Sequence, residues 1–86
     1  MEIKKKVILR SVAGEYMLMP VGDTALQYNG IFIMTESARV LWEAIVSGRE
    51  REELTDLLLS EYDIDRATAE ADVNEFLERL SAYGII

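Results

Sequence analysis

Residues 1–34 contain short apolar runs whose composition is typical of β-strands. The runs 7–12, 16–19 and 31–34 are rich in β-branched, methionine and aromatic side chains. Gly14 lies between the first two runs and suits the positive φ of a tight turn, while Pro20 marks the end of the second run. The pattern predicts an antiparallel hairpin followed by a third strand.

The connection between the second and third runs is interpreted from its composition. Residues 21–24 resemble a loop, residues 25–28 are expected to be extended, and Asn29-Gly30 is a turn signal. The third predicted strand therefore begins at Ile31.

From residue 35 the apolar spacing changes to that of a helix. One helical face is formed by four residues at i, i+3, i+4 and i+7, which are Ala38, Leu41, Trp42 and Ile45. Thr35 is the predicted N-cap, and Ser47-Gly48 is a typical helix end. We expect Trp42 to anchor this first helix in the core.

Two further amphipathic segments follow. The second predicted helix has its apolar face at Leu54, Leu57, Leu58 and Tyr62. Its start has a weak cap, because Arg49 and Glu50 stand where Ser, Thr or Asp is preferred. The third predicted helix begins after the N-cap Asp65 and ends at Gly84, with an apolar contact from Ile85-Ile86. Its apolar stripe is Ala69, Val73, Phe76, Leu77 and Leu80.

Strands in the first part and helices in the second predict an α+β fold. We expect a three-stranded antiparallel sheet (about residues 7–34) followed by three helices (about residues 36–83), similar to a winged helix-turn-helix. At 86 residues, the chain is expected to form one domain over residues 1–86.

The composition argues against several classes of function. Without cysteine or histidine, the chain has no disulfide, no usual zinc ligand, and no Cys–His or Ser–His nucleophile pair. We therefore expect no catalytic residue, no metal site and no cofactor, and a small enzyme is the least favoured interpretation. The longest uncharged run, residues 24–35, is shorter than the roughly 20 residues of a membrane span. We expect a cytoplasmic protein without a membrane partner.

The net charge of −7 is unevenly distributed. Residues 1–35 contain four basic and three acidic side chains, whereas residues 36–86 contain five basic and thirteen acidic ones. An acidic helical half argues against binding to a phosphate backbone, so we expect no nucleic-acid partner.

Several segments together resemble the PqqD family of pyrroloquinoline quinone biosynthesis. The segment 34–42, with sequence MTESARVLW, is similar to the family's entry into its first helix. The resemblance continues through residues 52–54, 62–65 and 71–77, and Gly84-Ile85-Ile86 is similar to the family's closing Gly-Leu-Leu. Gly14-Glu15-Tyr16 to Pro20 also fits the family's second strand. The chain departs from the pattern at Met34-Thr35, where the family has Leu-Asn, and at Ala38, where it has Gly.

The resemblance implies a non-catalytic peptide-binding module. Such domains recognise the leader of a ribosomally made precursor peptide and present it to a modifying enzyme, often a radical SAM protein. The leader is added as a strand beside the third strand and lies against the third helix. The resemblance implies peptide contacts at Ile31, Phe32, Ile33, Met34, Val73, Asn74, Leu77 and Leu80. The period of two leaves open whether Ile31 and Ile33, or Phe32 and Met34, face the core.

Two other functions are compatible with the predicted fold. A winged-helix regulator would place the third helix in the DNA major groove, although that helix is acidic, and a salt-dependent gel shift would reveal this activity. A homodimeric scaffold would pair an exposed edge strand with its own copy. The acidic side chains Glu70, Asp72, Glu75 and Glu78 are interpreted as a solvated helix face that could favour a basic leader.

Overall fold

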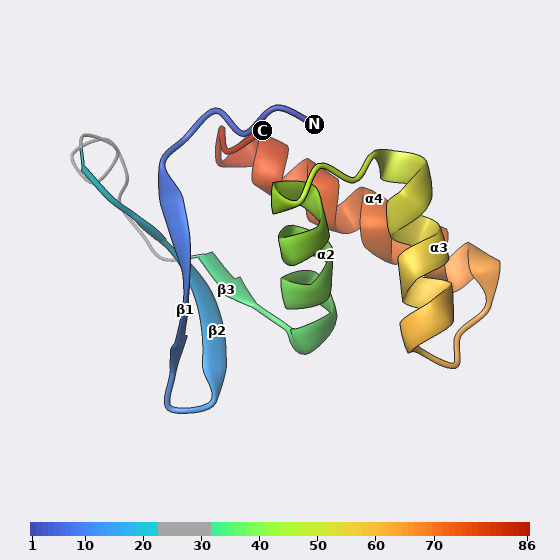
Figure 1. The fold of residues 1–86 in the computed structure, drawn as a ribbon. Helices are drawn as coiled ribbons and strands as arrows, with labels where there is room; N and C mark the ends of the chain where they lie inside the picture. The colour runs from blue at the N-terminus through green and yellow to red at the C-terminus, as the bar shows by residue number, and fades with distance from the viewer. Residues whose placement is uncertain (23–31) are drawn as a thin grey trace.

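The fold is known from a computed structural model, which describes residues 1–22 and 32–86. These residues form a three-stranded antiparallel sheet and three helices, with the sheet at one side of the molecule and the helices packed against one of its faces (Figure 1). The strands are β1 (Val7–Val12), β2 (Glu15–Pro20) and β3 (Phe32–Met34), and the helices are α2 (Glu36–Val46), α3 (Arg51–Glu61) and α4 (Arg66–Ala82). The predicted α+β class and the order of elements are confirmed. The predicted extended stretch 25–28, the turn 29–30 and Ile31 lie outside the described residues.

The sheet has the order β1-β2-β3, so β2 is central and β3 lies at one edge. A two-residue turn joins β1 to β2, because Val12 pairs directly with Glu15. Ala13 and Gly14 both have positive φ, at 54° and 82°, which is the conformation of the two-residue turns that match the strand twist. Gly14 adopts it without steric cost, whereas Ala13 pays roughly 1–2 kcal/mol.

The register of the strands decides which side chains face the helices. Leu18 pairs with Leu9 on one side and with Phe32 on the other, and this row faces the core. The next row, in which Met17 pairs with Ile33, faces outward. The helices α2, α3 and α4 pack on the inner face, and the apolar side chains Ile8, Val12 and Ile33 are exposed on the outer face.

The helices start and stop where local chemistry allows. The Thr35 hydroxyl accepts a hydrogen bond from the Ala38 N–H at 3.2 Å and caps α2, as predicted. At the start of α3, Glu50 takes the N-cap position, and the Glu53 carboxylate accepts from the Glu50 N–H at 3.2 Å. In return, the Glu53 N–H donates to the Glu50 carbonyl at 3.0 Å. Together, these two contacts compensate for the absence of Ser, Thr or Asp at the cap.

The end of α4 has the complete hydrogen-bond pattern expected of a glycine-terminated helix. Gly84 has φ 72°, its N–H donates to the Ser81 carbonyl, and the Ile85 N–H donates to the Leu80 carbonyl, both at 2.9 Å. Ile85 is fully buried, as predicted for the apolar contact after the cap. Its carbonyl also accepts from the Lys4 N–H, which ties the two ends of the described chain together.

The core lies between the inner face of the sheet and the three helices. Its fully buried large side chains are Leu18, Phe32, Leu41, Ile45, Leu54, Leu58, Val73, Leu80 and Ile85. Trp42 is also buried, as predicted for the anchor of the first helix.

The N-cap of α4 makes stability depend on pH. Hydrogen bonds from the side chain and backbone of Thr68 lower the pKa of Asp65 below its ordinary value of 3.8. A lowered folded-state pKa adds stability above the unfolded pKa, and this contribution disappears as the pH falls through the folded one. Urea unfolding at about pH 6 and about pH 3 should therefore show a smaller acid-induced loss for Asp65→Asn than for the natural chain, since Asn caps without titrating. Asp63→Asn, outside the cap, is the matched control, and an equal effect of both variants would contradict the prediction.

Candidate functional site

The third strand combines a buried face, an exposed face and an unpaired edge. Phe32 and Met34 are 1% and 4% exposed, whereas Ile33 between them is 56% exposed. Of the two orientations that the sequence left open, the structure therefore selects the one with Phe32 and Met34 under the sheet. Among the described residues β3 pairs with β2 only, so the backbone groups on its other side face away from the sheet.

The C-terminal half of α4 packs against β3 through aromatic rings. The ring of Phe32 makes edge-to-face contacts with Phe76, at 6.1 Å between centroids, and with Tyr83, at 5.1 Å. The guanidinium of Arg79 lies over the same ring, 4.5 Å from its centroid. These contacts hold the C-terminal half of α4 beside β3.

A cavity of about 210 Å³ opens between the start of α2 and α4. Its walls combine apolar and charged side chains, which are Thr35, Ser37, Ala38, Leu41, Asp72, Glu75, Phe76 and Arg79. On α4 these residues recur at i, i+3, i+4 and i+7, so they form one helix face. Among the described residues, neither Asp72 nor Glu75 forms an ion pair. Their charges are therefore available to a ligand.

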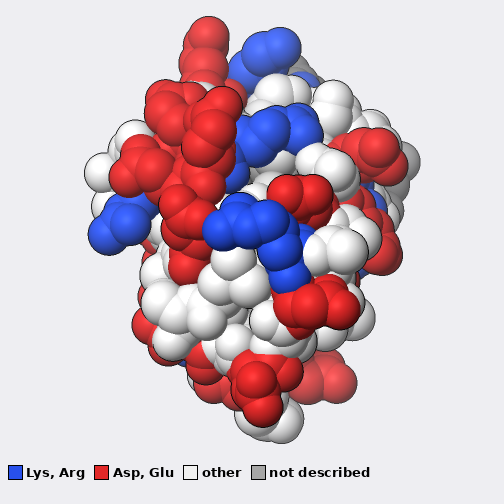
Figure 2. Space-filling model, turned by 90° about the vertical axis from the view of Figure 1, so that its right-hand side faces the viewer, with Lys and Arg blue, Asp and Glu red and all other residues white. Residues whose placement is uncertain are grey.

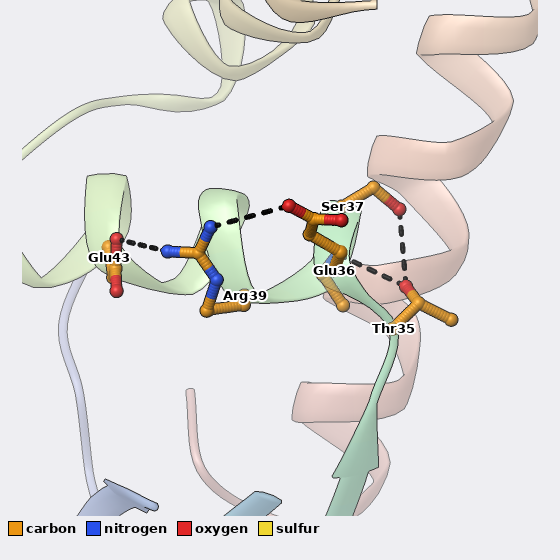
Figure 3. Close-up of polar contacts among 6 residues, drawn as sticks. Thr35, Glu36, Ser37, Arg39 and Glu43 are labelled. Atoms are coloured by element: carbon orange, nitrogen blue, oxygen red, sulfur yellow. Dashed lines mark hydrogen bonds and ion pairs between the residues drawn. The ribbon is translucent and has the colours of Figure 1, made fainter. Parts of the chain in front are cut away.

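Polar contacts link the residues at the start of α2, of which Thr35 and Ser37 line this cavity (Figure 3). The hydroxyl groups of Thr35 and Ser37 lie 3.1 Å apart and share a hydrogen bond. Arg39 reaches Glu43 at 2.9 Å and Glu36 at 3.9 Å. The hydrogen bond to Glu43 is the main cause that raises the pKa of Arg39. The same guanidinium lies 5.0 Å from the ring centroid of Tyr16, so the start of α2 is held against β2.

The structure separates the predicted site residues into two groups. Phe32, Ile33 and Met34 form the edge strand, while Ile31 lies outside the described residues. On α4, Val73, Leu77 and Leu80 are 2% exposed or less and belong to the core. Asn74 is exposed on the side of α4 that faces α3, where its side-chain oxygen accepts from Arg51 at 2.6 Å. None of these four lines the cavity beside β3.

The α4 residues that line the cavity were the ones interpreted from the sequence as core or solvated face. Phe76 was assigned to the apolar stripe, and Asp72 and Glu75 to the charged face. The signal that could have found them is the boundary between the two faces, since a groove wall needs an apolar floor and a polar rim. Carboxylates are spread over the helical side of the molecule, with a few Lys and Arg between them (Figure 2).

The described residues contain no group of three or more carboxylates arranged to hold a metal ion, and none of their helices is long and apolar enough to cross a membrane. Together, the edge strand, the aromatic floor and the charged rim are typical of a site that binds an extended chain.

Comparisons with known proteins agree with this class of site. The solved structure of "TbiB1 in Complex with the TbiA(beta) Leader Peptide" is similar with a TM-score of 0.79 and 27% sequence identity, over 99% of this chain and 93% of that one. The family described as "Coenzyme PQQ synthesis protein D (PqqD)" matches residues 6–86. The chain therefore belongs to the PqqD family. No curated protein matches its sequence.

The burial pattern separates core residues from surface residues by their effect on stability. Leu77→Ala removes a buried side chain and should lower the free energy of unfolding by about 2–5 kcal/mol. Ile33→Thr changes an exposed position on the outer face and keeps a β-branched residue, so it should change stability by no more than about 0.5 kcal/mol. Urea unfolding followed by circular dichroism measures both. Equal losses for the two variants would contradict the assignment of Leu77 to the core and Ile33 to the surface.

Proposed function

We propose that this chain is a non-catalytic peptide-recognition module that binds the leader of a ribosomally made precursor peptide. The observation that carries the proposal is the unpaired edge of β3, which lies beside an aromatic and charged groove on α4. The similar TbiB1 structure, which contains a leader peptide, supports the same assignment.

Strand addition explains how such a site would bind. The peptide's backbone pairs with the free N–H and C=O groups of β3, which gives affinity for any extended chain. Alternate peptide side chains then point toward α4, where Phe76 forms the floor and Asp72, Glu75 and Arg79 form the rim. The site residues Phe32, Ile33 and Met34 would contribute mainly through their backbone, while Val73, Leu77 and Leu80 would support the groove from below.

The residue types at the groove favour recognition over catalysis. The chain has no histidine or cysteine that could serve as a nucleophile or as a base near neutral pH. The polar side-chain groups around the cavity beside β3 are two hydroxyls, two carboxylates and one guanidinium. We therefore assign the chemistry to a separate modifying enzyme, such as a radical SAM protein, to which this chain presents the peptide.

The outer face of the sheet supports a protein partner of this kind. Ile8, Val12 and Ile33 are exposed there, so a partner that covers this face would bury apolar surface. A further apolar cavity, of about 410 Å³, opens between β1 and α2. It is lined by Ile3, Val7, Ile8, Leu9, Trp42, Glu43 and Val46. A homodimer through the edge of β3 would occupy the peptide site, so it would compete with leader binding. A measurement of the oligomeric state distinguishes the two.

The proposal is tested by an amide-proton NMR titration with several candidate leader peptides. We expect the largest shifts at Phe32–Met34 and along α4 from Asp72 to Arg79. N-methylation of single peptide residues should weaken binding at alternate positions, because only every second peptide N–H donates to β3.

Two controls accompany this titration. A scrambled leader of the same composition should leave the spectrum unchanged, and a leader N-methylated at every second residue on the side away from β3 should bind normally. A flat titration of well-folded protein with all of these leaders, or N-methylation effects without a period of two, would refute strand addition.

DNA binding is the weaker alternative. α4 would be the helix that enters the major groove, yet its exposed side chains include Glu70, Asp72, Glu75 and Glu78 against Arg66 and Arg79. Neighbouring phosphates would repel such a surface.

A further inference from the structure

A second cavity continues the groove beyond the end of β3. It has a volume of about 370 Å³ and is lined by Thr35, Glu36, Ser37, Leu58, Tyr62, Ile64 and Asp72. Thr35, Ser37 and Asp72 line both cavities, so the two are contiguous across the start of α2. This extension is formed by the first turn of α2, which follows β3 directly after Thr35, by the segment at the end of α3, and by the first half of α4.

The length of the groove fits a short extended peptide. Arg79 and Asp72 are seven residues apart on α4, which corresponds to about 10 Å along the helix axis. An extended chain covers that distance in about three residues. A peptide paired with β3 beside Arg79 therefore reaches Asp72 and the second cavity about three residues later.

The walls of the second cavity are apolar below and negative at the rim. Leu58 is fully buried beneath it, and Tyr62 and Ile64 are half-buried at its side. Burial, followed by the nearby Glu36 carboxylate, raises the pKa of Tyr62, which agrees with Glu36 lying close to the Tyr62 ring. A purely apolar occupant would bury the carboxylate of Asp72, which has no ion pair among the described residues, at a free-energy cost.

The other charges near the cavity do not cancel this negative rim. Arg39 forms ion pairs with both Glu43, at 2.9 Å, and Glu36, at 3.9 Å (Figure 3), so its single positive charge is shared between two carboxylates. The N-terminus of α2 contributes about half a positive charge, which is less than the full charge of Glu36 in its first turn. Asp72, which has no ion pair among the described residues, adds a second full negative charge from α4.

We propose that the bound peptide continues past β3 and places a lysine or arginine side chain in this second cavity, an inference that rests on the proposed function. The aliphatic stem of that side chain packs on Leu58, Tyr62 and Ile64, and its cationic head lies between the carboxylates of Glu36 and Asp72. Long basic side chains suit such a site because they combine an apolar stem with a charged end. The peptide recognised by this chain then carries a basic residue at a fixed distance from the segment that pairs with β3.

The test is a selection of randomised peptides, about 14 residues long, by mRNA display on three forms of the full chain. These are the natural chain, the double variant Glu36→Gln/Asp72→Asn, and the control Glu70→Gln/Glu78→Gln. The control changes the net charge equally, but Glu70 and Glu78 line cavities on other sides of α4. Circular dichroism of all three forms verifies that they are folded.

The natural chain and the control should enrich peptides that contain a segment suited to pairing with β3, in which every second side chain is of one type. Beside this segment, these peptides should have Lys or Arg at one fixed position. The double variant should enrich the same segment without that basic residue. For one selected peptide, each carboxylate removed should weaken binding by about two- to fivefold in low salt. The difference should largely disappear in about 1 M NaCl, where the screening length is about 3 Å.

A charge reversal gives a second, positive readout. Asp72→Lys should shift the enriched residue at the same position from Lys or Arg to Asp or Glu. Peptides that pair with β3 but lack a fixed basic position, or that keep it with the double variant, would overturn this inference alone. If no peptide binds any form of the folded chain, the proposed function fails and this inference fails with it.

Discussion

The packing of Phe32 against α4 is the contact on which the rest of the structure depends. Phe32 is at once the first residue of the edge strand, a member of the Leu9–Leu18–Phe32 row and the centre of the aromatic contacts with Phe76 and Tyr83. Truncating a buried Phe typically costs about 3–5 kcal/mol, a large part of the 5–15 kcal/mol that stabilises a small domain. This one ring therefore couples the stability of the fold to the position of β3 beside α4, and the width of the groove follows from the same contact.

The groove divides affinity and specificity between backbone and side chains. The edge of a strand pairs with any extended peptide, so β3 by itself discriminates little between sequences. Discrimination has to come from the side chains that surround the paired peptide, and here these include the Phe76 ring and the carboxylates of Asp72 and Glu75, which form no ion pair among the described residues. Negative charge over the helical side (Figure 2) disfavours phosphate-rich ligands and adds a long-range preference for basic peptides.

A sheet covered on one side only leaves two surfaces for interaction. The helices α2, α3 and α4 all pack on the inner face, and no helix among residues 1–22 and 32–86 covers the outer one. The outer row then exposes Ile33 directly above the edge at which a peptide would pair. A partner on the outer face and a peptide on the edge would therefore lie next to each other, as presentation of a peptide to an enzyme requires.

The sequence by itself determined the features that depend on neighbours along the chain. The caps Thr35 and Asp65 and the terminating Gly84 were predicted because each acts within four residues of its own position. The order of strands and helices, and the resemblance to the PqqD family, were also readable from residue spacing.

What only the tertiary structure decided was the use of each face. The period of two could not tell whether Phe32 or Ile33 points inward, since both are apolar, and the choice follows from the pairing of Phe32 with Leu18. The period of α4 likewise could not separate Val73 and Leu77, which are core, from Asp72 and Glu75, which line the groove. That distinction depends on how the helix is rotated against β3, and the rotation is fixed by contacts between residues more than forty positions apart in the chain.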